Sequence, residues 1–544
     1  MRAIDILIAN GLIFDGSGRL PYKGNIGISG DRIEFVIRTS GDTENSGRSA
    51  EAGHTIDASG MAVSPGFIDT HAHSEFTLLA DPSAQGKVSQ GITTEINGNC
   101  GLSAAPLYGE AFEHREGDLK EYDIPERWSD LGEYFRILSG RKPALNFITL
   151  AGHGNVRASV LGYKDRRPDR GEAAKMQSML REAVQQGAIG LSTGLIYPPG
   201  VYSTTEELVD LVGSLNLLPD PKSYIYTSHM RSEGDSLCES VEEVIRIGSE
   251  TGLKVHVSHI KTSGQRNWHK IERVLFLVET ARKNGIPITC DRYPYTASST
   301  DLDTIVPSWA YDGGIEAELS RLKSPEIGER IRREILCEHP ENNYWEEVRV
   351  SSVASDKNRW MEGKTIAFIA AKKEQTPVDA LFTVLIEEEL RVGAIFSSMS
   401  EENLKRFLSL PYAMVGTDSS SRSFSGTTAR GKPHPRGFGS FPRYLGRYVR
   451  DRRLMDLNEA IHRITLLPAI TFGIPDRGIL KEGAFADIVI FDERNIIDRA
   501  TYDDPFLKSE GIYYTLVNGE PAVWEGRLTN RRAGRILKAA GAGK

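Results

Sequence analysis

Hydrophobic residues follow one pattern at the two ends of the chain and another in its middle. Near the N-terminus, the apolar stretches DILIANGLIFDGSG and NIGISGDRIEFVI are separated by Asn-Gly, Asp-Gly and Gly-Asp turns. The same pattern returns near the C-terminus in GILKEGAFADIVIFD and IYYTLVNGEPAVWEGRL. Short strands between such turns are typical of small β-rich domains. We therefore expect a small β-sandwich built from both termini, residues 1–62 plus 476–544, around a central domain.

The middle of the chain alternates apolar strands with amphipathic helices. Helices are predicted at 171–186, 236–250, 268–284 and 401–410, and Ser203 with Glu206 predicts a capping box at the start of another. The strands expected between helices are AVSPGFIDTHAH, GITTEINGNC, ALNFITLAGHG, AIGLSTGLIY, SYIYTSHM, KVHVSHIK, IPITCDRYPY and YAMVGTDSS. Eight strands with helices between them predict an α/β fold, a (β/α)8 TIM-like barrel over residues 63–475. Residues 298–393, between strands seven and eight, break the alternation and predict an inserted subdomain or lid.

Charge and cysteine content narrow the class of protein. The 544 residues include 66 basic and 74 acidic side chains, a net charge of −8, so we expect neither nucleic acid nor membrane as a partner. The four cysteines are far apart and form no CxxC pair, which suits a reducing compartment. The N-terminal stretch is interrupted by Asp5, Asn10 and Asp15, and no apolar run approaches the roughly 18 residues of a membrane span. We expect a cytoplasmic protein.

Metal-competent side chains stand where the predicted strands end. Barrel enzymes build their active sites at the rim formed by these C-terminal ends. The residues are His71 and His73 after strand one, Cys100 after two, His153 after three, His229 after five, His259 after six and Asp418 after eight. The predicted topology therefore brings together residues that are hundreds of positions apart.

The histidines at this rim have the spacing and chemistry of metal ligands. His71 and His73 are two residues apart in an extended segment, so both can reach one ion. His229 and His259 end adjacent strands. Zinc favours imidazole and thiolate, so two histidines and a cysteine can form a site with one position left for water. His256 lies three residues before His259, on the opposite face, and we expect it to be structural.

Cys100, Asp418 and His153 each admit an ordinary role beside the chemical one. Cys100 is a buried thiol, a nucleophile or a metal ligand; a nucleophile would not need the additional rim histidines, so among the chemical roles a ligand fits better. Asp418 is the candidate general base, because a carboxylate beside an activated water can accept its proton and pass it to a leaving amine; otherwise it is a turn residue. His153 either supports the site or the substrate, or is a structural histidine.

The ordered motifs of the chain resemble the N-acyl-D-amino-acid deacylases (D-aminoacylases) of the amidohydrolase superfamily. The resemblance covers nearly the whole chain, and GILKEGAFADIVIFD is similar to the segment that closes the superfamily's sandwich. The motifs that carry it are PGFIDTHAHSE, GITTEINGNCGLSAAPL, SHMRSEG, HVSHIKTSG, DRYPYTASST, GTDSSS and HPRGFGSFPRYLGRYV. This resemblance implies a metal-dependent hydrolase barrel.

The resemblance also implies a set of metal ligands. Cys100, His229 and His259 would hold one tightly bound zinc ion (Zn2+), while His71 and His73 would contribute to a second, weaker site that Cys100 can bridge. Many superfamily relatives use a carboxylated lysine at the end of strand four. The corresponding segment GAIGLSTGLIY has no lysine, which fits a cysteine in its place. A further departure is Ser-Glu at 74–75, where the family usually has an acidic pair.

Substrate contacts follow from the same resemblance. Arg436 in HPRGFGSFPR matches the family's arginine for the substrate carboxylate, where a planar guanidinium suits bidentate binding. Lys261, two residues after His259, would assist it. Tyr293 and Ser299 match the other polar contacts. Ordinary roles for Arg436 and Tyr293 would be a surface charge and a packed aromatic ring.

The activity implied by the resemblance is zinc-dependent hydrolysis of the amide bond of N-acyl-D-amino acids, or of related D-residue dipeptides. Asp418 would take a proton from water and deliver it to the leaving amine. The preference for the D-enantiomer rests on the resemblance alone, and the sequence indicates neither the acyl group nor the oligomeric state. Alternatives are a cyclic-amide hydrolase of the hydantoinase or dihydroorotase type, a metal-dependent dipeptidase, and a non-catalytic binding protein. The non-catalytic protein is disfavoured because all five candidate ligands and the candidate base are present.

Overall fold

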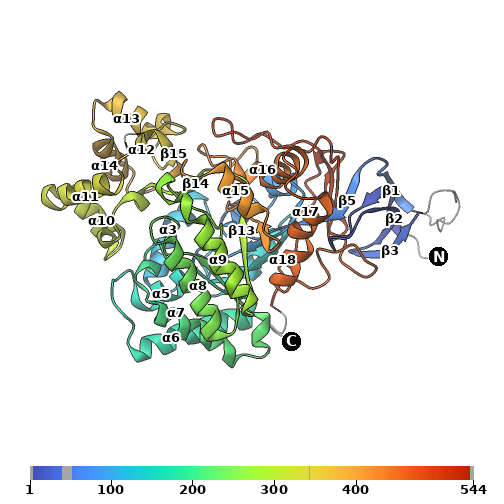
Figure 1. Cartoon of the computed structure of the whole chain (residues 1–544), viewed down its shortest axis with the longest axis horizontal. Coiled ribbons are helices and arrows are strands. Elements are labelled where there is room, and N and C mark those ends of the chain that lie inside the picture. The colour runs from blue at the N-terminus through green and yellow to red at the C-terminus, as the bar shows by residue number, and fades with distance from the viewer. Residues whose placement is uncertain (1–3, 40–51, 342, 540–544) are drawn as a thin grey trace.

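The computed structural model describes residues 4–39, 52–341 and 343–539 of the chain. Three regions lie along its longest axis (Figure 1). Strands near both ends of the chain gather at one end, and the helices α10–α14 lie at the other. The alternating strands and helices of the middle of the chain lie between these two regions.

Parallel strands form the centre of the molecule. In the described residues they make two sheets, in the orders β6-β7-β8 and β17-β13-β12-β11-β10-β9, with every pairing parallel. The strands are β6 (Phe67–Asp69), β7 (Ile92–Asn97), β8 (Asn146–Thr149), β9 (Ala151–Gly152), β10 (Gly190–Gly194), β11 (Ile225–His229), β12 (Lys254–Val257), β13 (Ile288–Arg292) and β17 (Ala413–Val415). Only Leu150 separates β8 from β9, and an isolated parallel bridge joins Ala72 to Ser419. The strand order thus returns to the segment that follows β6.

Helices follow these strands along the chain. They include α5 (His153–Leu161), α6 (Arg170–Gln186), α7 (Thr205–Gly213), α8 (Leu237–Thr251), α9 (Ile271–Lys283), α15 (Glu401–Leu408) and α17 (Leu457–Ile464). All of these except α5 and α17 lie where the sequence predicts a helix. In α8, Val241, Val244 and Ile247 are buried at the helical spacing of three and four residues. Gly252 ends that helix with a φ of 71°, a left-handed conformation that glycine adopts easily.

The capping prediction before α7 was wrong by one residue. Thr204, not Ser203, accepts a hydrogen bond from the backbone N–H of Glu207. The hydroxyl of Ser203 instead lies 3.4 Å from Nε2 of His153. The Ser203 side chain therefore contacts a residue that is distant in sequence instead of capping the helix.

The strands from the two ends of the chain share one sheet. Its order is β21-β20-β19-β18-β5-β1-β2-β3, with β4 beside β1. The strands are β1 (Ile4–Ile13), β2 (Tyr22–Ser29), β3 (Arg32–Arg38), β4 (Ala52–Asp57), β5 (Ala62–Pro65), β18 (Ile488–Phe491), β19 (Ile512–Val517), β20 (Glu520–Trp524) and β21 (Arg527–Leu528). Hydrogen bonds connect these strands continuously, and a bridge from Arg32 to Phe485 brings the β3 edge to the segment before β18. The sequence predicts a β-sandwich; in the structure the strands form one continuous sheet around a shared apolar core.

The segment between β13 and β17 has an apolar core of its own. It contains the antiparallel sheet β14-β16-β15 and a group of helices. The elements are β14 (Ser298–Asp301), α10 (Ile315–Lys323), α11 (Pro325–Glu338), α12 (Tyr344–Glu347), β15 (Val348–Val353), α13 (Ile366–Lys373), α14 (Pro377–Glu387) and β16 (Val392–Phe396). None of the helices in the described ranges combines the length and hydrophobicity that a membrane span requires.

A buried polar network ties the large mixed sheet to the parallel strand β8. The carboxylate of Asp487 accepts hydrogen bonds from the Arg477 guanidinium, from Nδ2 of Asn146 at 3.1 Å and from the backbone N–H of Asn518 at 2.8 Å. Asn518 in turn donates to Oδ1 of Asn146 at 2.8 Å. All four side chains are buried, so each polar group depends on the others for its hydrogen bonds.

Replacing the buried carboxylate should therefore destabilise the fold. Asp487→Asn should lower the free energy of unfolding by about 3–5 kcal/mol, because the Arg477 charge would remain buried without a counter-charge. Thermal unfolding measures this change as a lower midpoint. The control is Glu520→Gln in the same sheet, which breaks an exposed ion pair with Arg531 and should cost about 0–1 kcal/mol. Equal midpoints for the two variants would contradict the prediction.

Candidate active site

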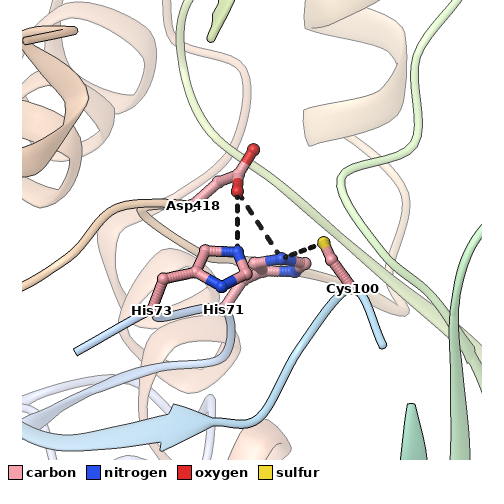
Figure 2. Close-up of side chains that lie close together, drawn as sticks. All are labelled: His71, His73, Cys100 and Asp418. Carbon is pink, nitrogen blue, oxygen red and sulfur yellow. Dashed lines mark hydrogen bonds and ion pairs between the residues drawn. The ribbon is translucent and has the colours of Figure 1, made fainter. Parts of the chain in front are cut away.

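Four of the predicted site residues converge beyond the ends of β6, β7 and β17. Figure 2 shows the side chains of His71, His73, Cys100 and Asp418 pointing toward one another. Oδ1 of Asp418 lies 3.6 Å from Nε2 of His71 and 3.3 Å from Nε2 of His73. Nε2 of His71 also lies 3.2 Å from Sγ of Cys100. His71 thus contacts both Cys100 and Asp418, although more than 300 residues separate His71 from Asp418.

Cys100 also belongs to a second cluster, formed with the histidines after β11 and β12. Its Sγ lies 3.5 Å from Nε2 of His259, and the rings of His229 and His259 are 4.4 Å apart. The donor atoms of Cys100, His229 and His259 all lie within 4.8 Å of one another, as do those of the first cluster. The structure therefore brings together all five residues that the sequence predicts as metal ligands, with the thiol shared between the two clusters.

Three residues of the site have a left-handed backbone. The φ angles are 54° at Cys100, 35° at His259 and 49° at Asp418. Such a conformation costs a non-glycine residue about 1–2 kcal/mol, and it persists only where the surroundings fix it. Here the N–H of Asp418 donates to the carbonyl of His71 at 2.8 Å, and the N–H of His259 donates to Oδ1 of Asp291 at 2.6 Å. The strained turns direct the three side chains into the site.

The electrostatic surroundings distinguish Cys100 from Cys290, the other buried cysteine of the described residues, which lies within β13. Burial raises the pKa of any thiol, but His71 and His229 outweigh this at Cys100 and hold its pKa well below the usual value. At Cys290, burial and the neighbouring Asp291 raise the thiol pKa. These surroundings favour the thiolate form at Cys100, the form that binds metals, and the neutral thiol at Cys290.

Asp418 is held by a cation on the side away from the imidazoles. Nη1 of Arg436 lies 2.8 Å from Oδ2 of Asp418, and both side chains are largely buried. Burial raises the pKa of the Asp418 carboxyl, but Arg436 and the nearby histidines keep it well below its ordinary value. Nη2 of Arg436 donates to the carbonyl of Ser299 at 3.1 Å, and its guanidinium lies 4.6 Å from the centre of the Tyr293 ring. Arg436, Tyr293 and Ser299 are thus neighbours of the candidate base.

Lys261 lies beside the second cluster but already faces an acidic side chain. Its Nζ contacts the carboxylate of Glu233 and lies 2.9 Å from Nδ1 of His259. Oε1 of Glu233 is itself 2.9 Å from Nδ1 of His259. Glu233 was not predicted, although its position four residues after His229 in SHMRSEG is a signal that could have identified it.

Tyr293 and Ser299 differ in the availability of their hydroxyls, and His153 lies outside both clusters. The Tyr293 side chain is fully buried, and within the described residues its hydroxyl has no hydrogen-bond partner. Oγ of Ser299 donates to the carbonyl of Ala394 at 2.9 Å. Nε2 of His153 lies 3.4 Å from the Ser203 hydroxyl and 3.7 Å from a carboxylate oxygen of Glu207, so these residues position His153.

The donor set fits zinc. Imidazole and thiolate are the ligands that zinc prefers in proteins. Within the described part of the chain, neither ring nitrogen of His229 has a hydrogen-bond partner, although the side chain is buried. Burial lowers the pKa of His229 and so favours the neutral imidazole that a metal requires. An imidazole with unused nitrogens beside a thiolate is the arrangement expected of a metal site.

Comparison with known proteins places the chain among metal-dependent hydrolases. The model of the Amidohydrolase family matches residues 54–523. The chain is 34% identical to N-acyl-D-glutamate deacylase of Alcaligenes xylosoxydans xylosoxydans, over 98% of this chain and 96% of that protein. It is 33% identical to D-aminoacylase of the same organism, over 98% of each.

A solved structure agrees with these relatives. The N-acyl-D-glutamate deacylase of Bordetella bronchiseptica, in complex with zinc and a phosphonate mimic of the tetrahedral intermediate, superposes with a TM-score of 0.80. It shares 34% identity, and the alignment covers 99% of this chain and all of that one. The shared fold is TIM-barrel-like with an additional domain. With its convergent histidines, cysteine and aspartate at the ends of parallel strands, the chain belongs to the amidohydrolase family.

Proposed function

We propose that this protein hydrolyses the amide bond of N-acyl-D-amino acids, or of related D-residue dipeptides, releasing a carboxylate and a free D-amino acid. The observation that carries the proposal is the Cys100, His229 and His259 cluster lying next to an ionised Asp418. Two similar proteins are named N-acyl-D-glutamate deacylase and D-aminoacylase, which supports the substrate class.

The proposal assigns zinc to the two clusters that share Cys100. Cys100, His229 and His259 would hold the tightly bound ion, and His71 and His73 would contribute to a weaker second site. When bound, zinc would act as a Lewis acid that makes a water molecule more acidic and polarises the amide carbonyl. The zinc complex of the Bordetella deacylase supports this choice of metal.

Asp418 would act as the general base and then as the general acid. Its ionised carboxylate, placed between Arg436 and the imidazoles, would accept the proton of the attacking water. Passing that proton to the amide nitrogen would complete the departure of the amine. Arg436, Lys261, Tyr293 and Ser299 would bind the substrate, with the two cations facing its carboxylate. In the structure both cations already contact acidic side chains, so this carboxylate would have to share them.

A division of the chain into domains accompanies this function. The two parallel sheets would form a single (β/α)8 barrel over residues 63–475, supported by the bridge from Ala72 to Ser419. Residues 1–62 plus 476–544 would form the separate β domain. Residues 298–393 would be inserted into the barrel, with Ser299 and Thr300 at its junction with the site, where the Thr300 hydroxyl lies 2.9 Å from that of Tyr197.

A substrate panel tests the proposed activity. Purified protein should hydrolyse N-acetyl-D-amino acids at least about tenfold faster, in kcat/KM, than the L-enantiomers or hydantoins, a difference of about 1.4 kcal/mol in the transition state. The carboxamide analogues of the same substrates lack the carboxylate that Arg436 would bind and should have a higher KM. Hydrolysis of hydantoins in preference to linear amides would reject the proposal in favour of a cyclic-amide hydrolase.

Removing the shared thiolate should remove metal and activity together. Cys100→Ala should lose tightly bound zinc, measured by elemental analysis after dialysis against a chelator, and should show kcat at least about 100-fold below the wild type. The matched control is Cys290→Ala, which removes a buried thiol of raised pKa outside both clusters and should keep zinc and activity. A Cys100→Ala protein with full zinc content would refute the assignment.

Removing the base should separate metal binding from turnover. Asp418→Asn keeps the size of the side chain but cannot accept a proton, so kcat should fall about 100- to 10,000-fold while the tightly bound zinc remains. Steady-state kinetics and metal content on the same preparation measure both quantities. Asp235→Asn, in an exposed pair with Arg266, is the control and should behave as the wild type. Turnover within a factor of three of wild type would exclude Asp418 as the base.

A further inference from the structure

A buried carboxylate that the proposed function does not use stands behind the metal-binding histidines. Asp291 lies near the end of β13 and is only 1% exposed, with its side chain among residues of β12 and of the segments that follow β6 and β12. Its Oδ1 accepts the backbone N–H of His259 at 2.6 Å. Its Oδ2 lies 3.4 Å from Nδ1 of His71 and accepts from the Thr70 hydroxyl at 3.3 Å. One carboxylate thus contacts both clusters from the side opposite Cys100.

The contact with His71 determines which ring nitrogen is free for a metal. Nε2 of His71 faces Cys100 and Asp418, whereas Nδ1 lies 3.4 Å from Oδ2 of Asp291 at an ion-pair distance and has no hydrogen-bond partner of standard geometry in the described residues. An ionised carboxylate can only accept, so it favours the tautomer with the hydrogen on Nδ1. That tautomer leaves the lone pair of Nε2 directed into the site. Metal-binding histidines commonly donate their second N–H to a carboxylate in this way.

The contact with His259 fixes a strained backbone. His259 has a φ of 35°, and the N–H that this conformation directs inward is accepted by Oδ1 of Asp291. Loss of this acceptor would leave a buried N–H without a partner, which is unfavourable because the N–H would have no water to bind instead. The turn would then relax toward an unstrained conformation and move the imidazole. Asp291 therefore holds one ligand through its ring and another through its backbone.

His256 and Thr289 hold the carboxylate itself in place. Nε2 of His256 lies 2.8 Å from Oδ2 of Asp291, and Nδ1 of His256 lies 2.8 Å from the Thr289 hydroxyl. Both histidine contacts, with His71 and with His256, keep the pKa of the Asp291 carboxyl below its ordinary range against the effect of burial. His256 thus has the structural role that we expect from the sequence, and it supports the site through its contact with Asp291.

We propose that Asp291 is a positioning residue for the metal centre, which sets the tautomer of His71 and the backbone of His259 without touching metal or substrate. The inference rests on the proposed function in that it takes His71 and His259 as metal ligands. It does not depend on which amide the enzyme hydrolyses.

Asparagine is the informative replacement for Asp291. Its side chain has the same shape, but one of the two acceptor oxygens becomes an NH2 group, which donates hydrogen bonds. With its oxygen facing the His259 N–H, its NH2 group faces Nδ1 of His71 and forces the hydrogen of that ring onto Nε2. With the amide turned round, two N–H donors meet at His259. Either orientation disturbs one metal ligand, whereas His256 can accept from the amide after a change of tautomer.

Zinc affinity tests the proposal independently of catalysis. Full-length protein is stripped of metal, and zinc binding is measured by competition with a chromophoric chelator. Asp291→Asn should weaken zinc binding about 10- to 100-fold, and Asp291→Glu, which retains two acceptor oxygens, should weaken it less. Adding Asp291→Asn to His71→Ala should weaken binding by a smaller factor than in the wild type, because the contribution through His71 is already lost.

Asp487→Asn is the matched control, because it removes another buried carboxylate that accepts several hydrogen bonds outside the site. It should lower thermal stability and leave zinc affinity unchanged. The proposal is overturned if Asp291→Asn binds zinc like the wild type, and its His71 part is overturned if the effect of Asp291→Asn is undiminished in the His71→Ala background. If Asp291→Asn does not fold, Asp291→Glu with and without His71→Ala decides by the same criterion. Normal zinc binding with no hydrolysis of the substrate panel would reject the proposed substrate and leave this inference standing.

Discussion

A buried thiolate surrounded by imidazoles is the interaction on which the site depends. Taking the charge of Cys100 out of water is unfavourable, and the neighbouring imidazoles of His71 and His229 offset this cost. Those histidines can approach the sulfur only if the ends of β7 and β11 and the segment after β6 lie at one level. The parallel pairing of the strands provides that alignment. The need to stabilise the charge of Cys100 therefore constrains the register of the parallel strands.

Carboxylates around the imidazoles extend this arrangement. Asp291 faces His71, Glu233 faces His259, and Asp418 faces both His71 and His73. Each imidazole is thereby oriented by an acidic group, which in turn has a partner of its own: His256 for Asp291, Lys261 for Glu233 and Arg436 for Asp418. In each case an imidazole is followed by a carboxylate, and the carboxylate by a cation or a hydrogen-bond donor. Many ionisable groups can therefore be buried close together, because each has a partner within contact distance.

The regions outside the parallel strands support this centre in different ways. The mixed sheet is anchored to β8 through Asp487 and Asn146, at the opposite end of that strand from the site. The inserted segment has a separate apolar core, and its first strand brings Ser299 and Thr300 to Arg436 and Tyr197. The contacts of this segment with the site thus come from β14, whereas the metal-competent side chains stand at the ends of the parallel strands.

Much of the fold and of the metal site was predictable from the sequence. Helical periodicity with a terminal glycine identified α6 and α8, and the rule that barrel sites form at strand ends selected His71, His73, Cys100, His229, His259 and Asp418. The same rule applies to Asp291, at the end of β13, which was nevertheless passed over in favour of Tyr293 in the same motif. The residue types and their spacing carried this information because strand alternation and helical periodicity are local properties of the chain.

Other features were decided only by the tertiary structure. Ser203 contacts His153 instead of capping α7, Lys261 faces Glu233, and Arg436 lies against Asp418. The strands from the two ends of the chain also join in one continuous sheet. In each case the partner is distant in sequence, and the choice of partner depends on which groups are buried together. The sequence by itself thus determined which side chains reach the rim, while the folded structure determined how they pair, because pairing energies depend on distance and burial that no local pattern contains.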